Sequence, residues 1–210
     1  MQFKIFSKKV WSVIILTEFF ISVGLFFSLT KLNHSSPIAA PVPIVSLPTT
    51  TTLAIFPEQE QPNTGLPIRL KIPAISVDAA VEQVGLTASG AVDTPKNQDN
   101  VAWFKLGQIP GAIGSAVMDG HYGWKKSKPS VFDNLYKLSI GDEIYVEDEK
   151  GVVTTFVVRE KRRYDPTADA VRVFTLKDEK SHLNLITCEG DWDKDSKNYS
   201  RRLVVFADKQ

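Results

Sequence analysis

The chain has 210 residues, 43% of which are hydrophobic, and its 25 basic and 24 acidic side chains nearly cancel. This length allows one domain with an extension or two very small domains, and the hydrophobic content excludes disorder along the whole chain. The balanced charge gives no general indication of nucleic-acid binding. A single cysteine excludes both an intrachain disulfide framework and a cysteine-rich zinc module.

The charges are unevenly distributed along the chain. Residues 1–65 contain four lysines, no arginine and three acidic residues, whereas 21 basic and 21 acidic residues follow residue 65. The sequence therefore begins with a short basic stretch, continues through a charge-poor segment and ends in a densely but evenly charged domain.

An apolar run occupies residues 10–29 and follows three lysines, Lys4, Lys8 and Lys9. As a helix it would extend roughly 30 Å, the thickness of the hydrocarbon core of a membrane. Because positive charge stays inside, we predict an uncleaved single-pass signal anchor with residues 1–9 in the cytoplasm and the domain outside. The charged side chain of Glu18 lies within this run and raises the free energy of membrane insertion. The alternatives to an anchor are a cleaved signal peptide and a buried helix of a soluble domain.

Residues 30–65 have the composition of a linker. They contain six prolines and a run of four threonines, without sustained helical or strand periodicity. We predict a disordered tether that lifts the following domain clear of the membrane, with a reach on the order of 100 Å if it is fully polyproline-like or roughly 30 Å as a flexible coil. Disorder without a spacing role is the alternative.

From residue 66 to residue 210 the sequence is typical of a β-rich domain. Gly151 marks a hairpin turn, and the last strand is apolar enough for burial on both faces. Short helices are predicted at 130–138 and 171–176. Strands are predicted by alternation or by β-branched content at 69–72, 115–118, 144–147, 152–163, 183–187 and 203–206. Many short strands with few helices indicate a closed β-barrel.

Three side chains in this domain are candidates for chemistry. Cys188 ends a predicted strand before a polar loop predicted at 189–200, where a nucleophile would be placed, although most free cysteines are small core residues. His121 follows Gly120, whose freedom to turn would aim the imidazole. Arg202 begins the last apolar strand and would donate to a peptide carbonyl or an oxyanion, or else pair with a nearby acid.

A thiol beside an imidazole is a general arrangement for nucleophilic catalysis. Here the histidine precedes the cysteine, which is the reverse of the papain order, and the papain signature is absent. His34 and His182 lie in the linker and in a charged connection, so no role is assigned to them. The acid-rich stretch 142–149 is interpreted as a solvated face, with calcium binding as the alternative.

Three short stretches resemble the bacterial sortases: GH at 120–121, LITC at 185–188 and RLVVFA at 202–207. The similarity spans residues 66–207, and the tract 100–121 is most similar to the class E and F branches. The resemblance implies an eight-stranded β-barrel that acts as a cysteine transpeptidase. The thiol would attack an LPXTG-like sorting signal between threonine and glycine and form a thioacyl-enzyme.

The resemblance also implies a role for each candidate. Cys188 would be the nucleophile, His121 would protonate the leaving amine and deprotonate the incoming one, and Arg202 would hold the substrate and the oxyanion. Thr187 would shape the substrate site. The implied partners are surface proteins with a C-terminal sorting signal and, as amine acceptor, a cell-wall precursor or a pilin lysine. No cofactor, metal or nucleic acid is implied.

Two residues depart from the family pattern. Asn184 stands where a threonine is usual, and Asp119 stands two residues before His121, where small or apolar residues are common. An Asp119 side chain directed at the imidazole would favour its protonated form. Two other functions stay open for the chain: a non-enzymatic, membrane-anchored surface-binding domain, and a sortase-like endopeptidase in which water replaces the amine.

Overall fold

The computed structural model describes residues 64–124, 127–176 and 178–210. The predicted cytoplasmic segment, the predicted membrane anchor and nearly all of the predicted linker lie outside the described residues. Within the described part of the chain, no helix has the length and apolarity needed to cross a membrane.

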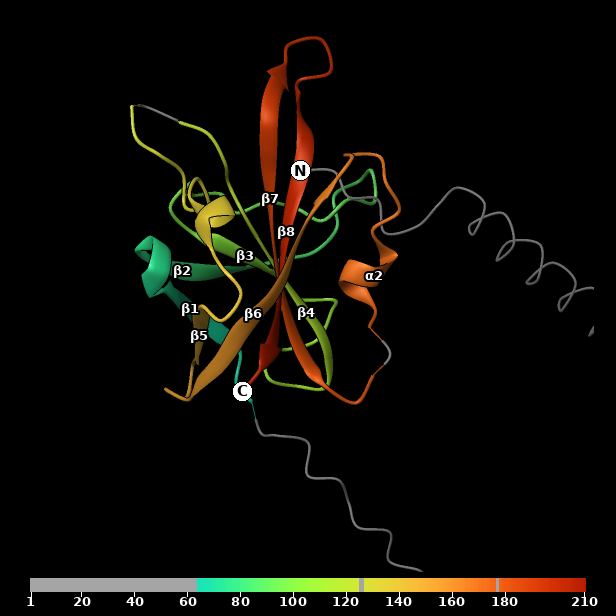
Figure 1. The fold of residues 1–210 in the computed structure, drawn as a ribbon. Coiled ribbons are helices and arrows are strands. Elements are labelled where there is room, and N and C mark those ends of the chain that lie inside the picture. Colours follow the sequence, from blue (N-terminus) through green and yellow to red (C-terminus); the bar gives the residue numbers. More distant parts are fainter. Residues whose placement is uncertain (1–63, 125–126, 177) are drawn as a thin grey trace, which may run out of the picture. The chain divides into compact units, whose positions relative to one another are not determined.

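Eight strands close into a barrel in the order β1-β2-β3-β4-β7-β8-β6-β5 (Figure 1). Three short helical segments accompany them: η1 (Pro73–Ile75), η2 (Leu135–Lys137) and α2 (Val171–Phe174). The strands are β1 (Pro67–Ile72), β2 (Val77–Val84), β3 (Val101–Phe104), β4 (Gly114–Gly120), β5 (Glu143–Asp148), β6 (Val153–Tyr164), β7 (Ser181–Asp193) and β8 (Asn198–Lys209). The expected mainly β, closed eight-stranded barrel with few helices is confirmed.

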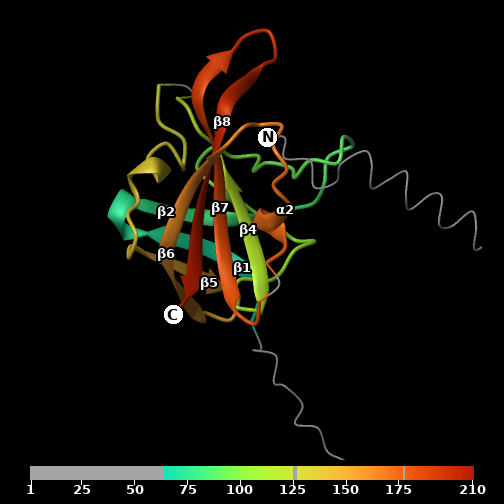
Figure 2. The same cartoon turned by 45° about the vertical axis from the view of Figure 1, so that its right-hand side comes forward.

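The prediction of a polar loop at 189–200 is wrong, because β7 continues to Asp193 and β8 already begins at Asn198. The two strands form a long hairpin that projects beyond the rest of the barrel (Figure 2). Trp192 pairs with Tyr199 across this hairpin, with ring centroids 5.1 Å apart. Such aromatic cross-strand pairs stabilise a hairpin that has no core to cover.

The sheet formed by β4, β7 and β8 is buried on both faces, as expected for the last strand. Alternate residues of these strands enter one of two apolar clusters. The barrel interior receives Ala116, Met118, Leu183, Leu185, Leu203 and Val205. The outer face, where Ala170 and Val173 of the α2 region cover the sheet, receives Val117, Ile186, Val204 and Phe206.

The acid-rich stretch 142–149 includes one residue with a structural role. The Asp148 carboxylate accepts hydrogen bonds from the backbone N–H groups of Lys150 and Val152 at 2.9 Å each. It also accepts one from Gly65 at 2.7 Å. Asp148 therefore holds both the hairpin turn, in which Gly151 has a φ of 77°, and the start of the barrel. No group of acidic, cysteine or histidine side chains suited to a metal ion occurs among the described residues.

Candidate active site

The pairing of β4, β7 and β8 brings the three candidate residues to one place on the sheet. Strands β4 and β7 are parallel, with Asp119 level with Ile186, so two residues further along His121 comes level with Cys188. Strands β7 and β8 are antiparallel, and Arg202 is the cross-strand partner of Cys188. Because side chains alternate along a strand, these residues share the outer face with Ile186.

The Cys188 thiol is only partly exposed. Burial raises its pKa, the charge of Arg202 lowers it, and Asp119 raises it. The net upward shift keeps the sulfur as a neutral thiol at neutral pH. A nucleophilic thiolate at this position therefore needs a base that takes the proton when the substrate is bound.

The His121 ring is held at a defined orientation. Its Nε2 lies 2.8 Å from the carbonyl oxygen of Pro95. A carbonyl can only accept, so Nε2 carries a proton and Nδ1 is the ring atom left to exchange one. The backbone is fixed as well, since the His121 carbonyl accepts from the N–H of Phe132 at 3.0 Å.

Gly120 has a different role from the sharp turn expected of it. It ends β4 and is not among the glycines with positive φ. A Cβ at this position would lie 2.4 Å from the nearest ring atom of Phe132. Glycine is required because the buried ring packs directly against the backbone, one residue before His121.

The Arg202 side chain is completely buried, whereas Arg201 is exposed. Its guanidinium donates to the carbonyls of Tyr199 at 3.1 Å and Arg201 at 2.9 Å, and to Asn198 Oδ1. These partners are neutral, so the alternative of an ion pair with an acid of the hairpin is not what the structure shows. Its Nε has no hydrogen-bond partner, which leaves one buried donor available to a bound group.

Thr187 is buried, and its hydroxyl donates to the carbonyl of Gly120 at 2.7 Å. This bond ties β7 to the end of β4, where His121 follows. The structure therefore gives Thr187 a part in aligning the two strands. Its contact with a substrate stays a prediction.

Asp119 is the buried acid of the site. It is 2% exposed, and its Oδ1 has no hydrogen-bond partner. Burial raises its pKa to about 8, while the Gly120 backbone and the charge of Arg202 oppose the shift. The departure from the family pattern at this position was visible in the sequence, but the burial that keeps the carboxyl neutral was not.

An aromatic group next to the site was missed by the sequence analysis. Tyr122 and Tyr199 meet edge to face with ring centroids 5.2 Å apart, and Trp192 also packs against Tyr199. Burial raises the pKa of Tyr199, and Cys188 contributes in the same direction, which places the phenol near the thiol. Tyr122 directly after the GH pair was the signal available in the sequence.

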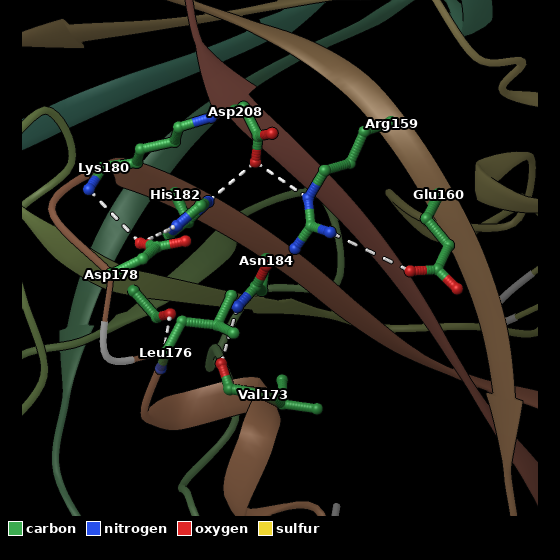
Figure 3. Close-up of polar contacts among 10 residues, drawn as sticks. Arg159, Glu160, Val173, Leu176, Asp178, Lys180, His182, Asn184 and Asp208 are labelled. Atoms are coloured by element: carbon green, nitrogen blue, oxygen red, sulfur yellow. Dashed lines mark hydrogen bonds and ion pairs between the residues drawn. The ribbon is translucent and has the colours of Figure 1, made fainter.

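Near its first residues, strand β7 also makes polar contacts with the segment that carries α2 (Figure 3). Asn184 donates to the Val173 carbonyl at 2.6 Å. In the His182 ring, Nε2 lies 2.6 Å from Asp178 Oδ1 and Nδ1 lies 2.7 Å from Asp208 Oδ1. His182, to which the sequence gave no role, thus joins the preceding connection to β8.

A family model described as Sortase domain matches residues 70–210. Sortase C-1 from Actinomyces oris superposes with a TM-score of 0.55 at 23% identity, covering 68% of this chain and 72% of that one. Sortase C-1 from Streptococcus pneumoniae superposes with a TM-score of 0.53 at 22% identity, covering 68% of this chain and 66% of that one. Sortase A from Corynebacterium diphtheriae superposes with a TM-score of 0.54 at 21% identity, covering 70% of this chain and 61% of that one. No curated protein sequence matches the chain. At these identities the solved structures show the fold alone.

Proposed function

The chain belongs to the sortase family of cysteine transpeptidases, and from that premise we propose that it cleaves an LPXTG-like sorting signal between threonine and glycine. The acyl product would be transferred to an amine of a cell-wall precursor or of a pilin. One observation supports the proposal: Arg202 pairs with Cys188 across β7 and β8, and the parallel pairing of β4 with β7, extended by two residues, brings His121 level with the same cysteine.

The first half of the reaction would acylate the enzyme. His121 Nδ1 takes the proton of the Cys188 thiol as the sulfur attacks the threonine carbonyl, so a C–S bond forms. The buried guanidinium of Arg202, on the strand beside Cys188, would stabilise the negative charge on the carbonyl oxygen through its own positive charge. The C–N bond then breaks, and the imidazolium gives its proton to the leaving glycine amine.

The second half would transfer the acyl group. An incoming amine attacks the thioester carbonyl, and His121 removes a proton from the amine. The C–S bond breaks, and the sulfur leaves as a thiolate that is reprotonated by the imidazolium. The same residues thus act in both halves, with the roles of acid and base exchanged.

The proposed location is the cell membrane, with the N-terminus inside and the catalytic domain outside. It is supported by the apolar run at 10–29, the lysines before it and the proline-rich segment after it. A tether of this kind would keep the enzyme near substrates that are themselves held at the membrane during export.

The test uses the full chain in detergent micelles with an LPXTG-type peptide. Wild-type protein should gain the mass of the acyl fragment at Cys188, whereas Cys188→Ala should retain its thermal unfolding profile and form no adduct. Unchanged cleavage by Cys188→Ala would overturn the proposal.

Product analysis separates the remaining alternatives. A ligated product that depends on added amine supports a transpeptidase, while only hydrolysed product in the presence of amine would indicate an endopeptidase. A thiol that is inert to alkylating probes in the folded protein, with no peptide turnover, would indicate a surface-binding domain.

A further inference from the structure

Two buried polar atoms near Cys188 lack a partner, and they are complementary. Asp119 Oδ1 is an acceptor and Arg202 Nε is a donor, and neither makes a hydrogen bond within the protein. Buried polar atoms are nearly always paired, so an unpaired one calls for an explanation, such as a group that binds there. Here an acceptor and a donor are left over at the same site.

The two residues flank the nucleophile from opposite sides. Asp119 lies on β4 and Arg202 on β8, with β7 and its Cys188 between them. Both face the outer side of the sheet, as the alternation along the strands requires. Both are close enough to the sulfur to shift the pKa of the thiol, in opposite directions.

A trans peptide unit has the shape that this pair would bind. Its carbonyl oxygen and its N–H point in opposite directions within one plane. We propose that Asp119 and Arg202 bind one peptide unit of the sorting signal, with Arg202 Nε donating to its carbonyl and Asp119 Oδ1 accepting from its N–H. This inference rests on the proposed function and adds Asp119 as a substrate-binding residue. Because only main-chain atoms are bound, the contact is independent of the variable side chains of the signal.

The state of the Asp119 carboxyl is compatible with this role. Burial holds the carboxyl neutral at pH 7, and a neutral carboxyl still offers an acceptor oxygen. A neutral acid also avoids repulsion of the thiolate that forms on Cys188. Asparagine has nearly the same shape and also accepts through oxygen, so Asp119→Asn is the conservative variant.

The test uses the full chain in detergent and peptides in which one non-scissile amide is replaced by an ester. The ester removes the N–H donor without adding bulk. In the wild type, one ester position should lower kcat/KM about five- to tenfold, as expected for one hydrogen bond. Asp119→Ala should lose a similar factor with the amide peptide and show no further loss with that ester. Asp119→Asn should keep the ester penalty.

Ser181→Ala is the matched control, because Ser181 Oγ is also buried without a partner but lies at the far end of β7. It should show the wild-type ester penalty. If the ester lowers kcat/KM equally in the wild type and in Asp119→Ala, the inference is overturned while the proposed function stays intact. The same holds if no ester position lowers kcat/KM in the wild type. Should Asp119→Ala fail to fold, loss of the penalty in Asp119→Asn would overturn it. Failure of the wild type to acylate on any peptide would overturn the proposed function and the inference together.

Discussion

Replacing Gly120 by alanine would press a methyl group against the ring of Phe132. The new Cβ would lie 2.4, 2.7 and 2.8 Å from three atoms of that ring, well inside van der Waals contact. The ring cannot withdraw, because Phe132 is fully buried among the core residues of the barrel. Overpacking of this kind costs about 1–3 kcal/mol of the free energy of unfolding, which a domain of ordinary stability survives.

The same substitution should impair turnover more than stability. Phe132 donates its backbone N–H to the carbonyl of His121, so a displaced ring moves the imidazole. A shift of about 1 Å in a catalytic group costs on the order of a hundredfold in rate. We therefore expect Gly120→Ala to fold, to lose about 1–3 kcal/mol in urea unfolding, and to lose most of its kcat with an LPXTG-type peptide.

Gly85→Ala is the matched control, because its nearest neighbour is the flexible end of Lys105 at 3.8 Å. It should be neutral or slightly stabilising, by up to about 1 kcal/mol, with unchanged kcat. Replacing the ring with a smaller side chain by Phe132→Leu should partly restore the kcat and the stability of Gly120→Ala. Full activity and stability in Gly120→Ala alone would refute the reasoning, because the contact with the ring would then not constrain His121.

Three further predictions concern groups in and beside the site. Burial raises the pKa of Asp119 to about 8, so folding takes up a proton between roughly pH 4 and pH 8. The stability of the wild type relative to Asp119→Asn should therefore fall as the pH rises through this window in urea titrations, and parallel curves would contradict it. Burial raises the pKa of the Cys188 thiol and Arg202 lowers it, so Arg202→Met should slow iodoacetamide alkylation at pH 8; equal rates would argue against the coupling. Asn184→Leu removes the donor to the Val173 carbonyl and should cost about 1–3 kcal/mol in chemical denaturation, and a negligible loss would mean that this bond does not hold α2.

The strands with a clear apolar face could be predicted from sequence, and the others could not. Residues 152–163 and 203–206 show β-branched or apolar patterns that match β6 and β8. Strands β2 and β3 were missed, because β2 contains two alanines and β3 has only four residues. The helix expected at 130–138 is reduced to turns and the three residues of η2. The outer part of the β7–β8 hairpin covers no core, so its polar residues resemble a loop.

In the candidate site, too, some residues could be predicted from the sequence and others could not. Chain order and short motifs identified Cys188, His121 and Arg202, because these signals are local in sequence. The groups that fix them are distant along the chain and become neighbours only on folding. Pro95 lies 26 residues before His121 and binds its ring. The burial that makes Asp119 a neutral acid likewise arises from tertiary packing, and no local pattern encodes it.

The bond between Gly65 and Asp148 has a mechanical consequence. The chain enters the barrel at Gly65, beside β1, and β1 stands opposite β7 in the closed strand order. Tension arriving along the preceding segment would therefore load β1 and the Asp148 turn first. The strands that carry Cys188, His121 and Arg202 lie on the other side of the barrel, outside the path of that load. If the proposed tether is pulled, the wall that contains β1 would strain first, while the opposite wall would keep the geometry of the site.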